Sequence, residues 1–295
     1  MNVAIGLPAY NEEKNIARII ARLQDSQYTV IVCNDGSTDL TGSISEKMGV
    51  TVLNHPRNLG YGAAIKSLFK KAKELSCDVL VTFDADGQHS VSEISNLINP
   101  IKKGEADIVI GSRFLEGKGK NIPRYRKAGI KVITSLTTSS TKLKLTDSQS
   151  GFRGYSNRVL QEIIPSESGM GVSTEILIKA SKKNFRIKEV PITVFYGEET
   201  STHNPVPHGI SVILSTMKFI SIERPLRFYG IPGIIFLAIG LFFVVLTLQI
   251  FADTRQVTTN VALVGVSSTI FGMILLMTSI LLYSIVSVVR ERHRD

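Results

Sequence analysis

Two long stretches near the C-terminus contain no charged residue and no histidine, and they restrict the possible architecture more than any other feature. The first covers 25 positions from Phe228 to Ala252, and the second covers 34 positions from Gln256 to Val289. Either exceeds the roughly 20 helical residues that cross a bilayer core of about 30 Å. We therefore expect a polar domain over residues 1–200 and two transmembrane helices over residues 229–289. A core hairpin of a soluble protein is the alternative, which the length of both stretches disfavours.

Residues 201–228, between these parts, are predicted to form a loop and an amphipathic helix in the membrane interface. The apolar residues of this helix share one face, and they are Ile210, Ile213, Leu214, Met217 and Ile220. A helix that packs on its own domain shows the same pattern, but the position directly before a membrane span favours the interface.

The charges around the apolar stretches predict the topology. Two arginines precede the first stretch, three lie in a basic tail over residues 290–295, and the connecting loop carries one arginine beside one aspartate. In that order they are Arg224, Arg227, Arg290, Arg292, Arg294 and Arg255. By the positive-inside rule we expect an integral membrane protein whose N-terminal domain and C-terminus are both cytoplasmic. The first residues begin a strand and show no signal-peptide pattern, so export of this domain is not expected.

The net charge of +9 indicates anionic partners. The basic residues are dispersed and accompany no nucleic-acid-binding motif, so membrane lipids and phosphate-bearing ligands are the expected partners rather than nucleic acid. Cys33 and Cys77 each lie in or beside an apolar run, which favours buried reduced thiols over a disulfide framework.

Short apolar runs alternate with helical patterns over the first 115 residues. The runs predicted to be strands cover residues 2–7, 28–33, 50–54, 79–83 and 107–112. Their continuous apolarity indicates a parallel sheet that is covered on both faces. Between the first two strands, one helical face is formed by Ile16, Ile19, Ile20 and Leu23. The fold class is therefore a doubly wound, mostly parallel α/β domain, with a looser pattern of helices and short strands from residue 121 to 196.

Four polar clusters follow four of these strands, and they read PAYNEE, NDGSTD, DADGQH and GSRF. The carboxyl ends of parallel strands meet at one edge of a sheet, where α/β proteins bind their ligands. In the third cluster, Asp84 and Asp86 are two residues apart, so in extended chain their side chains point to the same side. Two such carboxylates repel each other unless a cation lies between them, and Mg²⁺ or Mn²⁺ is the simplest partner. Acidic residues after strands also cap helices, so the pair alone is a weak signal.

Six motifs in this order, PAYNEEKNI, NDGSTD, NLGYGAAI, DADGQH, GSRF and SGFRGYS, resemble those of inverting glycosyltransferases of family 2. The chain looks most like the group of dolichol-phosphate mannose synthases and polyprenyl-phosphate glucosyltransferases, over roughly residues 2–200 and in the membrane segments that follow. The resemblance implies a glycosyltransferase A-type fold, a nucleotide-diphosphate sugar donor carried by uridine or guanosine, a polyprenyl phosphate acceptor, and Mg²⁺ or Mn²⁺ as cofactor.

The same resemblance assigns residues to these ligands. The nucleotide sugar is assigned to Pro8, Tyr10, Glu12, Asp35, Asn58, Gly60 and Asp84, the metal to Asp84, Asp86 and Gln88, the acceptor phosphate to Arg113 and Arg126, and catalysis to Asp84, Asp86, Arg113 and Asp147. Read from the residues alone, Glu12 also suits a helix N-terminus and Asp35 a turn. The match at Arg126 is loose because Arg124 and Lys127 compete with it.

Four positions in or near these motifs leave questions open. Asn34 stands where the family more often has aspartate, so recognition of the base is unsettled there. Asp147 is at the place where the family often carries a catalytic carboxylate, yet an ionised phosphate acceptor needs no base, so Asp147 could instead position other groups. Arg153 in SGFRGYS could form a structural salt bridge, and His89 is read as a surface or packing residue.

The predicted function is transfer of a sugar from a nucleotide diphosphate to a polyprenyl phosphate at the cytoplasmic membrane face, with inversion, which gives a polyprenyl-phosphate monosaccharide. Two other functions stay open: a transferase acting on a lipid or glycan hydroxyl, and a non-catalytic membrane receptor that binds nucleotide sugars. A processive polysaccharide synthase is disfavoured because its Gln-x-x-Arg-Trp motif needs a tryptophan, and the chain has none.

Overall fold

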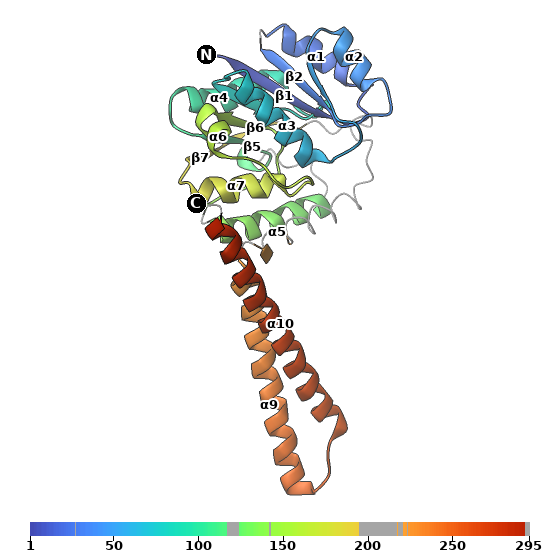
Figure 1. Cartoon of the computed structure of the whole chain (residues 1–295), viewed down its shortest axis with the longest axis vertical. Coiled ribbons are helices and arrows are strands. Elements are labelled where there is room, and N and C mark those ends of the chain that lie inside the picture. Colours follow the sequence, from blue (N-terminus) through green and yellow to red (C-terminus); the bar gives the residue numbers. More distant parts are fainter. Residues whose placement is uncertain are drawn as a thin grey trace. The chain divides into compact units, whose positions relative to one another are not determined.

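The computed structural model describes residues 1–26, 28–116, 124–141, 143–194, 217, 221–222 and 224–292 (Figure 1). The chain divides into two compact units, Met1–Thr216 and Met217–Asp295. Most of the predicted loop and interfacial helix over residues 201–228 lies outside the described residues, as does the end of the basic tail.

A seven-stranded sheet in the order β3-β2-β1-β4-β6-β5-β7 forms the centre of the first unit. The strands are β1 Val3–Ala9, β2 Thr29–Asn34, β3 Thr51–Asn54, β4 Val79–Thr82, β5 Ile108–Ser112, β6 Arg153–Ser156 and β7 Ile187–Pro191. Among these described strands β6 is antiparallel to both of its neighbours, and the other pairs are parallel. The predicted mostly parallel sheet is thus confirmed, and the antiparallel β6 adds to it.

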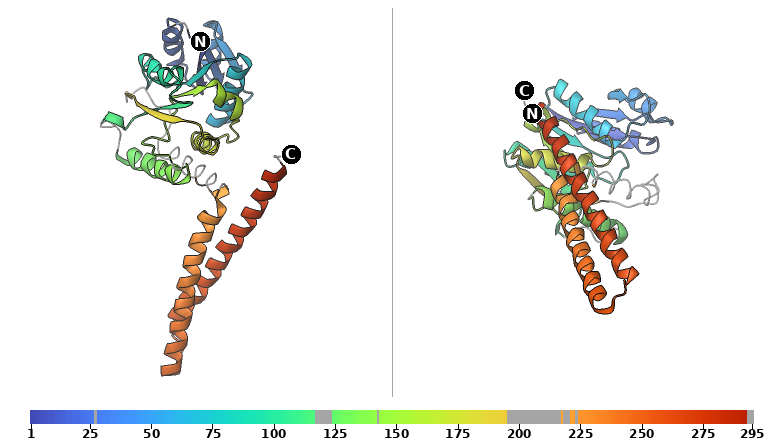
Figure 2. Two further views of the ribbon diagram at one scale, coloured as in Figure 1. Left: turned by 90° about the vertical axis from the view of Figure 1, so that its left-hand side faces the viewer. Right: turned by 60° about the horizontal axis from the view of Figure 1, so that its bottom comes forward.

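Helices cover both faces of this sheet, as the two views in Figure 2 show. One face packs on α3 Tyr61–Glu74, α6 Asn157–Glu162 and α7 Val172–Lys182, and the other packs on α1 Ile16–Gln24, α2 Thr41–Lys47 and α4 Ile94–Lys102. The 3₁₀ turn η1 Val91–Glu93 precedes α4, and α5 Arg124–Thr141 lies beside α7.

Alternation along the strands divides the apolar residues between two cores. In β1, Ala4 belongs to the core that includes Leu68 of α3, and the next residue, Ile5, belongs to the core that includes Ile20 of α1. The predicted helical face of α1 is buried as expected. Because each strand serves both cores, few polar residues fit within the strands, and the polar clusters collect at the strand ends.

Arg153, at the start of β6, is one of the largest fully buried side chains, with 1% exposure. Its guanidinium donates hydrogen bonds to three backbone carbonyls, of Ser148 at 2.6 Å, Ser150 at 2.7 Å and Ser173 at 2.9 Å. All three acceptors are carbonyls, so Arg153 has a structural role through hydrogen bonds to the backbone and not through the predicted salt bridge to a carboxylate. The side chain fastens the segment before β6 to the start of α7.

The second unit is a helical hairpin. The π-helical turn η3 Leu226–Gly230 leads into α9 Ile231–Thr254, and α10 Thr259–Arg292 returns antiparallel to it. Glycines let the helices approach closely, because a Cβ at Gly272 would lie 2.8 Å from the backbone nitrogen of Leu237, and one at Gly240 would overlap Thr269.

Both helices are long and apolar enough to cross a membrane, over Leu226–Thr254 and Thr259–Val288. Of the residues in their most apolar windows, 6% and 11% are buried within the protein. A core helix of a soluble protein would be mostly buried, so this exposure favours the predicted transmembrane hairpin over a soluble core.

We predict that Arg153→Met lowers the melting temperature of the detergent-solubilised chain by at least about 6 °C, because three buried carbonyls lose their donor at about 1 kcal/mol or more each. Thermal unfolding monitored by circular dichroism measures the shift. Lys188→Met is the matched control, since Lys188 is half exposed and pairs with Glu105 on the surface. Equal melting temperatures for the two variants would contradict the structural role of Arg153.

Candidate active site

A pocket of about 460 Å³ opens at the carboxyl ends of β1, β2, β4 and β5. Ten residues that the sequence singled out line it: Pro8, Tyr10, Glu12, Asp35, Asn58, Gly60, Asp84, Asp86, Gln88 and Arg113. Asp147 is not among the lining residues. Asp147 is fully buried, and Arg126 belongs to α5, with a side chain outside those that the structure describes.

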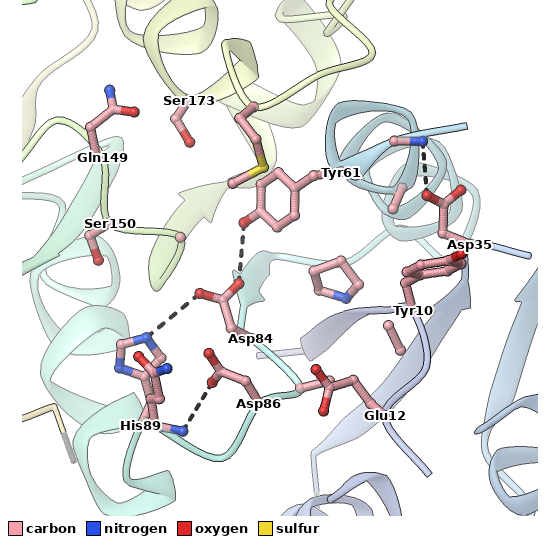
Figure 3. Close-up of a pocket in the computed structure, with 18 of the residues that line it drawn as sticks. Tyr10, Glu12, Asp35, Tyr61, Asp84, Asp86, His89, Gln149, Ser150 and Ser173 are labelled. Carbon is pink, nitrogen blue, oxygen red and sulfur yellow. Dashed lines mark hydrogen bonds and ion pairs between the residues drawn. The ribbon is translucent and has the colours of Figure 1, made fainter. Parts of the chain in front are cut away.

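The lining residues follow one another along the pocket, as Figure 3 shows. Tyr10 and Asp35 lie together at one end. The carboxylates of Glu12, Asp84 and Asp86 occupy the middle, and the loop with Gln149 and Ser150 lies at the other end. The pocket can thus hold an elongated ligand with chemically different parts.

The pKa of Glu12 is raised well above the ordinary value of a glutamate. The pKa of Glu12 is raised to about 7, chiefly by burial and to a lesser extent by the carboxylates of Asp86, Asp39 and Asp84, while a hydrogen bond from Asn15 at 3.1 Å opposes the rise. Loss of hydration is thus the main cause of the shift, and the three neighbouring carboxylates add to it.

Asp84 is held by groups to which the sequence assigned no role. The hydroxyl of Tyr61 donates to its Oδ1 at 3.3 Å, and Nε2 of His89 lies 3.7 Å from its Oδ2. Burial alone would raise the pKa of Asp84, but His89 and Tyr61 outweigh it and lower the pKa. The side chain of His89 is only 7% exposed, and its ring lies 4.9 Å from that of Phe152, so it packs inside the domain and is not a surface residue. A Cβ at Gly151 would lie 2.7–2.8 Å from the Asp84 oxygens, so only glycine fits there.

Tyr61 and Gly151 were not predicted as site residues, although their place in the sequence could have indicated them. Both lie inside recognised motifs, Tyr61 in NLGYGAAI and Gly151 in SGFRGYS. Only the fold shows that these two motifs meet at Asp84, because 90 residues separate them along the chain.

The residues around Asp84 fit a hard divalent cation. Asp84, Asp86 and Gln88 supply oxygen ligands of the kind that Mg²⁺ and Mn²⁺ prefer, and the carboxyl group of Glu12 lies close enough to Asp84 and Asp86 for their charges to raise its pKa. Among the described residues no three His, Cys, Asp or Glu side chains form a metal cluster by themselves. Diphosphate oxygens of a bound nucleotide would complete the coordination.

Arg113, directly after β5, forms an ion pair with Asp147. Its Nε and Nη2 donate to the two Asp147 oxygens at 2.6 and 2.8 Å, a bidentate pair. Burial would raise the pKa of Asp147, but the adjacent guanidinium outweighs it and lowers the pKa. Glu189 of β7 accepts hydrogen bonds from the backbone nitrogens of Thr146 and Asp147 and so fixes this loop. Asp147 is therefore oriented toward Arg113, while Arg113 lines the pocket.

Asn34, where the family more often has aspartate, does not line the pocket. Its side chain donates to Asn54 at 2.8 Å and accepts from the backbone nitrogen of Ser37 at 3.1 Å. The difference between Asn34 and aspartate therefore bears on the packing of β2 against β3 and not on a lining group.

The glycine-rich NLGYG loop directs its backbone N–H groups into the protein. Leu59 and Gly60 donate to Asp35, and Gly62 donates to the carbonyl of Ser168 at 2.8 Å. Gly60 has a φ of +99°, and a Cβ at Gly62 would overlap the carbonyl of Glu167. The glycines are thus required by a backbone contact, and the first turn of α3 is capped by Ser168 instead of by a phosphate.

The comparisons with known proteins agree with this arrangement. The sequence model of the family described as Glycosyl transferase family 2 matches residues 4–164. A UDP-N-acetylglucosamine–dolichyl-phosphate N-acetylglucosaminyltransferase of Methanococcus voltae is 36% identical over 213 residues, which cover 65% of this chain and 85% of that protein. A polyprenol monophosphomannose synthase of Mycolicibacterium smegmatis is 31% identical over 199 residues, covering 63% and 75%.

A solved structure supports the fold class independently. Glucosyl-3-phosphoglycerate synthase from Mycobacterium tuberculosis, in complex with Mn²⁺, uridine diphosphate and phosphoglyceric acid, matches with a TM-score of 0.56 at 19% identity. The match covers 74% of this chain and 78% of that one. It confirms the predicted mostly parallel sheet of glycosyltransferase A type.

We predict that in EDTA the free energy of unfolding falls as pH rises from about 4.5 to 7 and levels off above 7, with Glu12 contributing clearly less than about 3 kcal/mol to the fall because solvent screens this partly exposed group. The sign follows because the raised pKa makes the folded state bind more protons than the unfolded state in this window. Glu12→Gln should remove this part of the pH dependence. Denaturant unfolding of both proteins from pH 5 to 8 measures it, and identical slopes would contradict the prediction.

Proposed function

Since this chain belongs to glycosyltransferase family 2, we propose that it transfers a sugar from a nucleoside diphosphate to a polyprenyl phosphate at the cytoplasmic face of a membrane, with inversion at the anomeric carbon. The names of two relatives, which refer to dolichyl phosphate and to a polyprenol monophosphate product, support this acceptor class. The product is a polyprenyl-phosphate monosaccharide.

The donor fits along the pocket in one direction. The end formed by Tyr10 and Asp35 takes the nucleoside, the carboxylates of Asp84 and Asp86 take the cation and diphosphate, and the end with Gln149 takes the sugar. A bound Mg²⁺ or Mn²⁺ would stabilise the negative charge that develops on the departing diphosphate. The protein's own contribution is to hold the ligands in place through side chains that are themselves fixed, as Asp84 is by Tyr61 and His89.

The observation that carries the acceptor assignment is the pairing of Asp147 with Arg113. A hydroxyl acceptor needs a general base, and both oxygens of Asp147 already accept hydrogen bonds from a guanidinium. A phosphate monoester is ionised at neutral pH and can attack without a base. Arg113, oriented by Asp147, is then suited to hold that phosphate while its oxygen forms the bond to the anomeric carbon and the bond to the diphosphate breaks.

Membrane attachment through α9 and α10 supports a lipid acceptor, because a polyprenyl phosphate is confined to the bilayer. Arg224 and Arg227 before the hairpin, together with the basic tail, support cytoplasmic placement of both ends.

The main test combines the detergent-purified full chain, a polyprenyl phosphate, Mg²⁺ or Mn²⁺, and a panel of uridine- and guanosine-diphosphate sugars, with lipid products analysed by mass spectrometry. We expect a polyprenyl-phosphate monosaccharide from at least one donor, and Asp86→Ala should reduce its rate by at least about 100-fold. Asp25→Ala, at an exposed site, is the matched control. Donor binding without a lipid product would favour the receptor, and transfer to a hydroxyl would favour the other transferase.

We expect Asp147→Asn to raise the KM for polyprenyl phosphate by roughly tenfold, because the substitution removes the charge that orients Arg113. The affinity for the nucleotide sugar should stay within about twofold of the wild-type value, and the pH dependence of kcat should keep its shape. Steady-state kinetics with each substrate varied in turn measures this. Loss of the acidic limb of the pH profile in the variant would instead identify Asp147 as a general base.

A further inference from the structure

Asp35 lies at the nucleoside end of the pocket, and three donors hold its carboxylate. Nδ1 of His55 lies 2.6 Å from Oδ1, the backbone nitrogen of Leu59 donates to Oδ1 at 3.0 Å, and that of Gly60 donates to Oδ2 at 2.9 Å. Asp35 itself is only 3% exposed, yet it lines the pocket. Its orientation is therefore set before any ligand binds.

The number of open acceptor positions on Asp35 follows from these contacts. Each carboxylate oxygen accepts about two hydrogen bonds. Within the described part of the chain, Oδ1 has two donors and is filled, whereas Oδ2 has one. Asp35 can therefore offer a ligand one acceptor position, on a group that carries negative charge when ionised.

Nucleobases differ in what they present to such a group. Guanine places a ring N–H and an amino group side by side, and a carboxylate pairs with both only if both oxygens are open. Cytosine and adenine place a ring nitrogen acceptor beside their amino group, and a carboxylate repels that acceptor. Uracil presents a single imide N–H, which matches one open acceptor. Tyr10, whose ring lies beside Asp35 in Figure 3, offers an aromatic surface next to this position.

We propose that Asp35 selects a pyrimidine imide, so that the donor of this chain is a uridine diphosphate sugar, and that His55 is the positioning residue for this selection. The proposal rests on the proposed function in two respects, namely that the pocket binds a nucleoside diphosphate and that the nucleoside lies at the end with Tyr10 and Asp35.

His55 has the geometry of a positioning residue. In the tautomer that donates from Nδ1 to Asp35, Nε2 accepts from the hydroxyl of Ser67 in α3 at 2.8 Å. Sγ of Cys33 lies 3.6 Å from the same Nε2, and burial raises the pKa of this thiol to about 12, so it is a neutral neighbour. The ring is thus fixed from both sides, between a helix and the carboxylate it orients. His55 does not belong to the pocket lining and acts through Asp35.

The first experiment is isothermal titration calorimetry of the full chain in detergent with Mn²⁺ and with UDP, dTDP, CDP and GDP in turn. We expect UDP to bind at least about tenfold more tightly than CDP or GDP. The dTDP arm separates the base from the sugar, because thymine has the same imide and the deoxyribose lacks one hydroxyl. Equal affinities for UDP and CDP would assign the open acceptor to the ribose and overturn the proposal, as would tighter binding of GDP.

Variants test the positioning role. His55→Ala should weaken UDP binding by about five- to tenfold and change GDP binding by less than threefold, so that the selectivity falls, while kcat at saturating donor is retained. His55→Asn should restore most of the selectivity, since its amide nitrogen takes nearly the place of Nδ1. Ser95→Ala, an exposed serine in α4, is the control. Equal weakening of UDP and GDP by His55→Ala would indicate a general structural role and contradict the proposal.

Because the binding measurements use free nucleotides and no acceptor, they separate this proposal from the proposed function. UDP selectivity without any lipid product would support the role of Asp35 and contradict the polyprenyl phosphate acceptor. A lipid product formed equally well from uridine and guanosine donors would support the acceptor and contradict the role of Asp35.

Discussion

Mutual repulsion among carboxylates at the edge of the sheet is the constraint on which the rest of this site depends. The parallel strands bring Glu12, Asp35, Asp84 and Asp86 to one pocket, and such a cluster costs folding free energy unless donors offset it. The protein offsets it unevenly. Asp35 receives two backbone amides and a histidine, and Asp84 receives a tyrosine and a histidine, whereas Glu12 has a pKa raised to about 7. These carboxylates lie where a bound divalent cation would offset their repulsion and would also attract an anionic diphosphate.

A second principle is that the motifs act mainly by holding one another. The glycines of NLGYG make room for the carbonyls of residues 167–169, Gly151 makes room for Asp84, and Asp147 orients Arg113. The pocket is therefore lined by a few groups whose positions are fixed by many internal contacts. Such preorganisation reduces the free energy that a bound substrate must supply to order the site.

The fold and most of the pocket lining could be predicted from the sequence, because continuous apolar strands and the polar residues that follow them are local signals. Tyr61 and His89 could not be assigned, since their roles depend on contacts with Asp84 that no spacing encodes. The antiparallel β6 was also missed, because its four residues, RGYS, carry no apolar pattern. Asp147 was placed among the catalytic residues through its position in a motif, and only the fold reveals that its two oxygens face Arg113.

The cap on α3 bears on how such enzymes can be recombined. The family match ends at residue 164, but the carbonyl that closes the first turn of α3 belongs to Ser168, and the buried carboxylate of Glu175 holds the backbone nitrogens of Ser166 and Glu167. A chimera joined at residue 164 would therefore combine the nucleoside end of the pocket from one protein with the segment that caps α3 from another. Exchange of donor specificity between relatives should use a junction beyond α7, so that the strand ends and the segment that braces them are inherited as one piece.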